Sequence, residues 1–226
     1  MSFFRLVGVV AVKDLRAELR TKEAINASFG FALVILILFS FAFERSIEGV
    51  QEISGGLLWI VFAFAGTLIL NRSFARELPN DCLDALISAP IPGAALFLGK
   101  AIANFVLVLA VELVSLPVFG IFYSVDWTKQ IWELLLVLLL GTWGLTVIGT
   151  IFSALTVNIR LREVMLPMLT YPIMVPALLG AMQLSSALVA GKPIGPDNVS
   201  WLKMLAGFDL IYTAASMVLV ETVLVG

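Results

Sequence analysis

The chain has 226 residues, of which 61% are hydrophobic and 13% are charged, and its net charge is -2. Soluble domains average about 45–50% apolar and about 25% charged residues, and a chain this small has no interior that could hide so much apolar surface from water. The composition therefore excludes a soluble globular domain, and the small net charge indicates no nucleic-acid partner.

The first predicted element is an amphipathic helix over residues 3–23, and we treat 1–24 as an N-terminal elbow segment. Its apolar residues come mostly first, which is the wrong order for a cleavable signal peptide. Apart from Arg5, its charged residues form a second part, which consists of Lys13, Asp14, Arg16, Glu18, Arg20, Lys22 and Glu23. Such a helix can lie in the plane of the membrane interface, with these charges in solvent. The alternative is a solvated extension of the first membrane span.

Six long apolar runs follow, and each is long enough to cross a bilayer as a helix. They cover about 27–43, 55–70, 94–123, 131–157, 164–190 and 202–225. Backbone groups in hydrocarbon must pair within their own segment, and the runs are too long and too uniformly apolar for barrel strands. We therefore predict an all-α membrane protein with six transmembrane helices, forming one transmembrane domain over residues 1–226.

The distribution of basic residues predicts the orientation of these spans. Ten lysines and arginines fall in the N-terminal segment and in the second and fourth loops, and the other four fall in the remaining loops. Because basic residues accumulate on the cytoplasmic side, we expect both termini in the cytoplasm.

The second loop, over residues 72–92, is the most informative polar segment. Asn80 or Asp81 can cap a short helix there, with Asp84 in its first turn, and the prolines at its end stop it. The apolar side of this helix consists of Leu83, Leu86 and Ile87. Such a helix can lie on the membrane surface or dock into a groove of another protein, and the residues alone leave both readings open.

The same loop carries a resemblance to a known family. The pattern Glu77-x5-Leu83-Asp84-x-Leu86-x3-Pro90-x-Pro92, followed by Gly99-Lys100, resembles the cytoplasmic loop of ABC-2-type export permeases. More narrowly, the chain is similar to the CcmB, or haem exporter protein B, family of cytochrome c maturation. The segments LLLGTWGLTVIGTIFSALTVNIR and MLPMLTYPIMVPALL are also similar to that family, so the resemblance covers nearly the whole chain. The family usually has a glycine and a small hydroxyl residue where this chain has Asp81-Cys82, and a glutamate where it has Asp84.

The resemblance implies the function, the location and the partners. It implies a permease subunit in the bacterial inner membrane that couples ATP hydrolysis in a separate ATPase to haem delivery or to release of a haem-loaded chaperone. The implied partners are a CcmA-like ABC ATPase, a CcmC-like haem-handling membrane protein and a small CcmD-like single-span protein, and a homodimer of this chain is left open. The residues expected to couple to the ATPase are Glu77, Leu83, Asp84, Leu86 and Pro90.

Missing residue types limit what this chain can do alone. It has no histidine, a single cysteine, Cys82, and no Gly-x4-Gly-Lys-Ser/Thr phosphate loop. Histidine-based catalytic units and cysteine-only metal cages are therefore impossible, and ATP must be hydrolysed elsewhere. We expect a non-catalytic subunit without a metal or a cofactor of its own, in which haem and ATP are handled by the complex. The alternatives are a stand-alone secondary transporter or channel, and an ABC-2 exporter permease for another substrate.

Polar residues inside the spans are the remaining candidates. Glu112 lies within the third span, where an acid is costly and should face protein or a wet cavity, and Asn104, two turns away, can line the same cavity. The alternative for Glu112 is a place nearer an interface, or a protonated, hydrogen-bonded side chain.

The fourth span carries a regular pattern of hydroxyl and small residues. Thr142, Thr146 and Thr150 share one helix face, and Gly141 and Gly149 form a neighbouring strip. Such residues let membrane helices approach closely. The strip can serve a subunit interface or a substrate path, or simply packing within the bundle.

Overall fold

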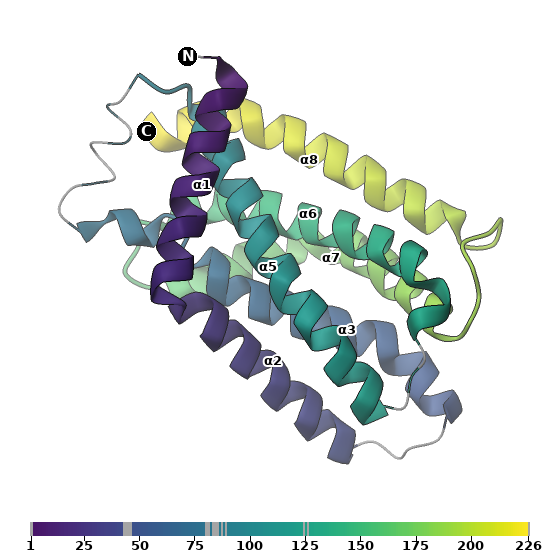
Figure 1. The fold of residues 1–226 in the computed structure, drawn as a ribbon. Helices are drawn as coiled ribbons and strands as arrows, with labels where there is room; N and C mark the ends of the chain where they lie inside the picture. Colours follow the sequence, from purple (N-terminus) through teal and green to yellow (C-terminus); the bar gives the residue numbers. More distant parts are fainter. Residues whose placement is uncertain are drawn as a thin grey trace.

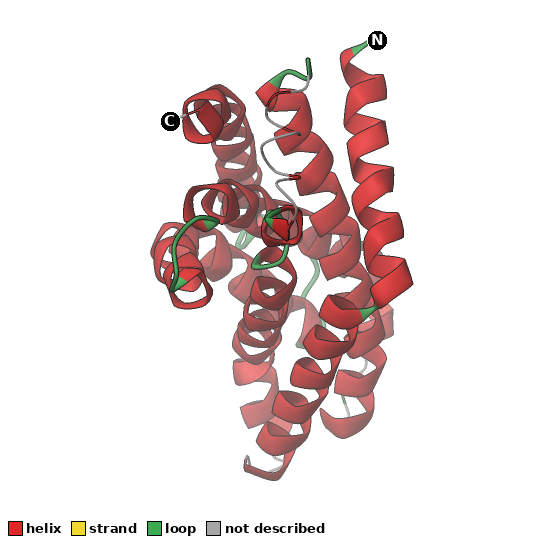
Figure 2. Cartoon of the chain, turned by 90° about the vertical axis from the view of Figure 1, so that its left-hand side faces the viewer, coloured by secondary structure: helices red, strands yellow, loops and turns green. Residues whose placement is uncertain are grey.

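The computed structural model describes residues 2–42, 47–79, 82, 86, 88, 90–123, 125 and 127–225. Within these residues all regular structure is helical (Figure 2). The long helices are α1 (Phe3–Thr21), α2 (Glu23–Ala42), α3 (Ile47–Leu70), α5 (Gly93–Tyr123), α6 (Ile131–Thr156), α7 (Arg162–Val189) and α8 (Val199–Val225). Two short 3-10 turns are η1 (Ala75–Glu77) and η3 (Trp127–Gln130).

Six of these helices, α2, α3 and α5 to α8, are long and apolar enough to cross a membrane. The prediction of six transmembrane helices is therefore confirmed, and most of their ends lie within four residues of the predicted ones. The exception is α3, which begins at Ile47 rather than at residue 55. A helix can continue past the apolar run that crosses the hydrocarbon, because polar side chains are tolerated beyond it.

The N-terminal helix α1 is a separate element and not an extension of the first span. Lys22 adopts a left-handed backbone conformation with φ 57°, which ends α1 and lets α2 leave in a new direction (Figure 1). The apolar side of α1 packs against α5, where Gly99 lets Val10 approach closely. Val7, Val10 and Ala11 are buried in this contact.

The centre of the bundle is formed by α3 and α6, whose spans are the most buried of the six. Trp59 of α3 is fully buried, its ring packs against Gly141 of α6, and its Nε1 donates a hydrogen bond to Ser185 Oγ at 2.9 Å. A buried indole N–H needs such a partner. The other four spans surround this pair of helices and keep more exposed apolar surface.

Both chain ends lie at the same end of the bundle, at the left in Figure 1. The same end holds α1, the end of α3, the start of α5 and the turn between α6 and α7 (Figure 1). The loop between α3 and α5 leaves from this end, so the segment with the family-like motif and the N-terminal helix are neighbours.

Candidate functional site

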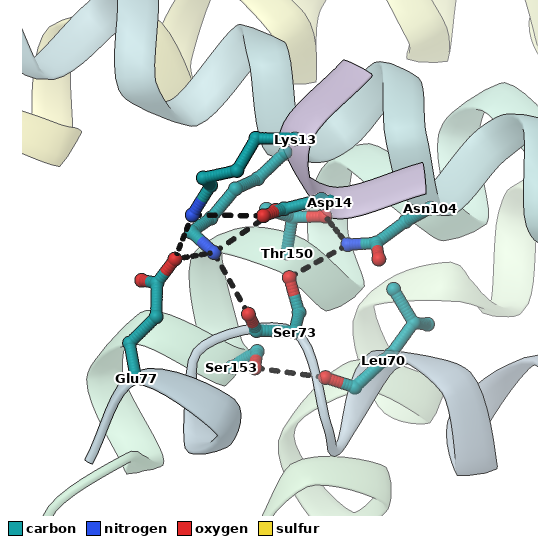
Figure 3. A network of polar contacts seen from close by, with 9 residues as sticks. Lys13, Asp14, Leu70, Ser73, Glu77, Asn104, Thr150 and Ser153 are labelled. Carbon is teal, nitrogen blue, oxygen red and sulfur yellow. Dashed lines mark hydrogen bonds and ion pairs between the residues drawn. The ribbon is translucent and has the colours of Figure 1, made fainter. Parts of the chain in front are cut away.

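A polar network of side chains lies at this end of the bundle (Figure 3), and its central residue is a buried lysine, Lys100. The side chain of Lys100, in the second turn of α5, is 0% exposed. Its Nζ donates to the Ser73 carbonyl oxygen at 2.8 Å, to Glu77 Oε1 at 3.0 Å and to Asp14 Oδ2 at 3.1 Å, and it lies 4.7 Å from the centre of the Phe74 ring. A buried charge is tolerated only with such partners, because its desolvation costs several kcal/mol (about 5) when unpaired.

A second lysine ties the N-terminal helix to the same carboxylates. Lys13 of α1 forms an ion pair with Glu77 and another with Asp14 at 2.9 Å. Burial works to lower the pKa of Lys13, but its bonds to Glu77 and Asp14 outweigh burial and leave the pKa above its usual value. Two lysines and two carboxylates thus lock α1 to η1 and α5.

Glu77, which we expected to couple the chain to the ATPase, lies inside the protein. It is 8% exposed, and its Oε1 accepts bonds from both lysines of the network. Its carboxylate therefore faces α1 and α5 inside the protein and not solvent. Glu77 lies within the loop over residues 72–92, and its ion pairs anchor that loop to α1 and α5.

Neutral polar groups extend the network to α6 (Figure 3). Asn104 Nδ2, one turn after Lys100 in α5, donates to Ser73 Oγ and to Thr150 Oγ1, both at 2.9 Å. Ser153 Oγ donates to the Leu70 carbonyl oxygen at 2.8 Å, at the last residue of α3. Side chains of α5 and α6 therefore hold the end of α3, in addition to the backbone turn bonds that its last carbonyls accept from residues 71–73.

Glu18 holds the junction between α1 and α2. Its Oε1 accepts hydrogen bonds from the backbone N–H groups of Ala24 (2.8 Å) and Ile25 (3.0 Å), and its other oxygen is paired with Arg76. These contacts satisfy the first turn of α2. We expected Glu18 among the solvent-facing charges, but it is 0% exposed, because the turn at Lys22 folds α2 back over it.

The loop itself is described only in part. Cys82, Leu86 and Ser88 are helical, Leu86 is half-buried and the other two are exposed, as is Pro90. Leu83 and Asp84, which we expected to contact the ATPase, lie outside the described residues. So do Asn80, Asp81 and Ile87.

A cavity of about 320 Å³ connects the loop to the network beneath it. It is lined by residues of α1, of the segment after α3 and of α5, and by Cys82 of the loop. Asn104 also lines it, but Glu112 does not, so the two polar residues that we placed in one cavity have different surroundings.

The residues of the fourth span lie inside the bundle. Thr142, Thr146 and Thr150 are each 0% exposed. A methyl group added at Gly149 would strike Leu70 of α3, so the small residues allow close contact between α6 and α3. Glu112 of α5 is also 0% exposed, and its Oε2 accepts a hydrogen bond from Thr142 Oγ1 at 2.6 Å.

Sequence reasoning missed a second intramembrane acid, Asp209 of α8. It is 5% exposed, and within the described part of the chain neither of its oxygens has a hydrogen-bond partner. A Cβ at Gly144 of α6 would lie 2.6 Å from its Oδ1. A single acid in the apolar run LAGFDLIYTAA is the same signal that identified Glu112.

Chemically, the network can hold helices together and relay movement, and it offers no reactive constellation. The described residues contain no group of three or more histidine, cysteine or acidic side chains that could hold a metal ion. Four separate segments meet in the network directly beneath the loop. A force applied to the loop would therefore reach α1, α3, α5 and α6 together.

Comparison with known proteins agrees with this architecture. The family model described as CcmB protein matches residues 5–221. The chain is 32% identical over 208 residues to heme exporter protein B of Rhodobacter capsulatus, covering 92% of this chain and 91% of that protein. It is 32% identical over 198 residues to heme exporter protein B of Pseudomonas aeruginosa, covering 86% of each protein. It is 29% identical over 199 residues to heme exporter protein B of Paracoccus denitrificans, covering 88% of this chain and 89% of that protein. A match over nearly the whole length places this multi-pass membrane protein, with its six candidate membrane spans, in the CcmB family.

Proposed function

We propose that this chain is the permease subunit of an ABC-type complex in cytochrome c maturation, located in the bacterial inner membrane. Membership of a family whose relatives are called heme exporter protein B is the observation that carries this proposal. The chain lacks a phosphate-binding loop, so ATP is hydrolysed by a separate, CcmA-like subunit.

In this proposal the loop between α3 and α5 is the contact with the ATPase. Its anchor, Glu77, is bound to Lys13 of α1 and Lys100 of α5, so movement of the loop cannot occur without these helices. Nucleotide-driven movement of the ATPase is thereby converted into movement of the elbow helix and the central spans. The network acts as a mechanical connection, because its buried charges resist separation.

Haem is held by a partner in this proposal, either the CcmC-like protein or the chaperone. The chain has no imidazole to ligate haem iron. ATP hydrolysis drives haem delivery or release of the haem-loaded chaperone. A CcmD-like small subunit belongs to the same assembly.

A stand-alone transporter is disfavoured, because the two intramembrane acids, Glu112 and Asp209, do not converge on one site. Glu112 contacts Thr142 of α6 and Asp209 lies against Gly144, and these two α6 residues are two positions apart, so they face directions about 160° apart around the helix.

The test is a pair of charge insertions in the loop. Leu86 is half-buried and Ser88 is exposed in the same helical segment. Leu86→Asp should remove an apolar anchor and place a charge in the contact, so co-purification of the ATPase should fall about 30-fold or more at matched membrane levels. Cytochrome c maturation should fall with it. Ser88→Asp adds the same charge at an exposed position, so this variant should retain more of the ATPase than Leu86→Asp does. Asp84→Ala should also reduce co-purification of the ATPase less than Leu86→Asp does.

The single cysteine supplies an independent measurement. Cys82 is exposed on the loop, so a maleimide should label it in the free chain and label it much more slowly once the ATPase is bound. If Leu86→Asp binds the ATPase as well as the parent chain does, and Cys82 stays reactive in the complex, the loop lies on the membrane surface and the coupling assignment is wrong.

A further inference from the structure

A second cavity, separate from the network, lies between α2, α3 and α7. Its volume is about 690 Å³, in the range of small-molecule sites. Three aromatic side chains, one from each helix, form a continuous apolar wall. The Phe31 and Phe64 ring centres are 6.4 Å apart, and those of Phe64 and Tyr171 are 5.1 Å apart. Tyr171 is fixed by a 2.8 Å hydrogen bond with Thr67.

The cavity opens sideways, toward the surface that faces lipid. Phe31 is 36% exposed and Phe64 is 46% exposed, although both line the cavity and belong to membrane spans. Their exposed surface would contact acyl chains. A molecule in this cavity can therefore enter from the bilayer and keep an apolar part there.

Three arginines line the other end of the same cavity, where α3 ends and α7 begins. Arg72 is paired with Glu23 at 2.5 Å and Arg76 with Glu18, but a guanidinium has five N–H donors, so each keeps some for a ligand. Arg162 forms no ion pair with any residue in the described part of the chain.

Two further features affect the charge at that end. Glu163, exposed, is the single acidic residue among those that line the cavity. The start of α7 has no side-chain cap, and although backbone carbonyls accept the N–H groups of Arg162, Val164 and Met165, the positive end of the helix dipole also favours an anion. Glu23 and Glu18 balance the charges of Arg72 and Arg76, so an anion at this end would bind through Arg162 and through the N–H donors that the other two guanidinium groups keep.

We propose that this cavity binds an anionic phospholipid, with its phosphate among Arg72, Arg76 and Arg162 and an acyl chain along the Phe31 and Phe64 rings. Arginine binds phosphate with paired, charge-assisted hydrogen bonds, and basic pockets between membrane helices are suited to anionic head groups. The shape favours an amphiphile, because a soluble anion would leave the aromatic wall unused. A lipid without net negative charge would leave Arg162 without a counter-charge, since of the three arginines only Arg72 and Arg76 are paired within the described part of the protein. The lipid would join α2 to α7 across α3, at the end of the bundle that carries the loop.

The first test removes one charge and compares it with a neighbour. The full chain, extracted with its native partners, is placed in nanodiscs of phosphatidylcholine containing a minority of phosphatidylglycerol, and bound lipid is identified by native mass spectrometry. Arg162→Gln should lower the preference for phosphatidylglycerol about fivefold. Arg160→Gln removes the same charge from an exposed position that does not line the cavity, and should leave the preference unchanged.

The second test fills the cavity without changing charge. Ala27 lines it from an exposed position on α2, so Ala27→Trp should fill the groove and abolish bound phosphatidylglycerol. Ala214→Trp, at an exposed position of α8, is the matched control.

Three results would overturn the proposal. One is equal lipid preference in Arg162→Gln and Arg160→Gln, and another is a parent chain that shows no preference for phosphatidylglycerol. The third is a different occupant of the cavity. This could be haem retained in place of phospholipid, which its absorbance would show. It could also be a second copy of the chain that covers the groove, which would be seen as a lipid-free dimer that Ala27→Trp dissociates.

Discussion

Lys100 shows how one residue can hold several elements together. Its ammonium has three donors, and all three are used, on the carboxylates of Asp14 and Glu77 and on the Ser73 carbonyl. This is complete pairing for a group that is 0% exposed. Removing the Lys100 ammonium leaves the largely buried carboxylates of Asp14 and Glu77 with Lys13 as their one shared cation among the residues of this network.

We therefore predict that Lys100→Met lowers the free energy of unfolding by about 3–5 kcal/mol, the usual cost of breaking a buried ion pair. Thermal unfolding in detergent measures this. Lys203→Met removes an exposed lysine of α8 and should change little. Lys100→Met combined with Glu77→Met should recover part of the loss, since it leaves the Lys13–Asp14 pair intact. Equal melting temperatures for the two single variants would show that the network is not stabilising.

Glu112 is the second residue whose role a substitution can decide. Its carboxylate accepts a hydrogen bond from Thr142, which a glutamine carbonyl can also accept. We predict that Glu112→Gln preserves cytochrome c maturation, whereas Glu112→Ala lowers stability by about 1–3 kcal/mol because the Thr142 hydroxyl loses its partner. If Glu112→Gln accumulates normally in the membrane but supports no maturation, the carboxylate carries a proton or a charge in the mechanism.

At the scale of elements, α1 depends on one close contact with α5. A Cβ at Gly99 would lie 2.7 Å from Val10 Cβ and 2.9 Å from the Val7 carbonyl oxygen, whereas a Cβ at Gly8 would meet nothing within 4 Å. Both glycines are helical, so alanine gains up to about 1 kcal/mol of helix propensity at either site. Only at Gly99 must the neighbouring helix move.

We predict that Gly99→Ala costs about 1–3 kcal/mol net and loosens α1, while Gly8→Ala is neutral or stabilising. Limited trypsin digestion at Lys22, at the junction of α1 and α2, reports the detachment directly, and thermal unfolding reports its cost. Equal protection of Lys22 in both variants would mean that α1 is held by its ion pairs and not by this contact.

At the scale of the whole molecule, the orientation in the membrane is open to a direct test. The positive-inside rule predicts that the loop with Cys82 faces the cytoplasm and that Lys192, between α7 and α8, faces the opposite side. A membrane-impermeant maleimide should label Cys82 in inside-out vesicles but not in intact spheroplasts. A chain carrying Cys82→Ser and Lys192→Cys should give the reverse pattern. Labelling of Cys82 from outside would invert the topology.

The sequence alone determined the spans and their type. A run of about 20 apolar residues in a bilayer has one stable backbone solution, so composition and length sufficed to predict six helices. The separate α1 was also predictable, because the five charged side chains in its second half cannot enter hydrocarbon. The periodicity of Thr142, Thr146 and Thr150 gave the face of α6 that is buried, since spacing on a single helix fixes which residues lie together.

The tertiary structure decided which polar residues meet. Lys100 was counted as a loop charge and Glu18 as a solvent-facing one, yet both are fully buried, because their partners come from segments distant in the sequence. Burial of a charge depends on the carboxylates or guanidinium groups that other helices bring to it, and no local pattern carries that information. The cavity lined by Arg72, Arg76 and Arg162 was equally invisible, because it exists only where α2 and α7 pack on either side of α3.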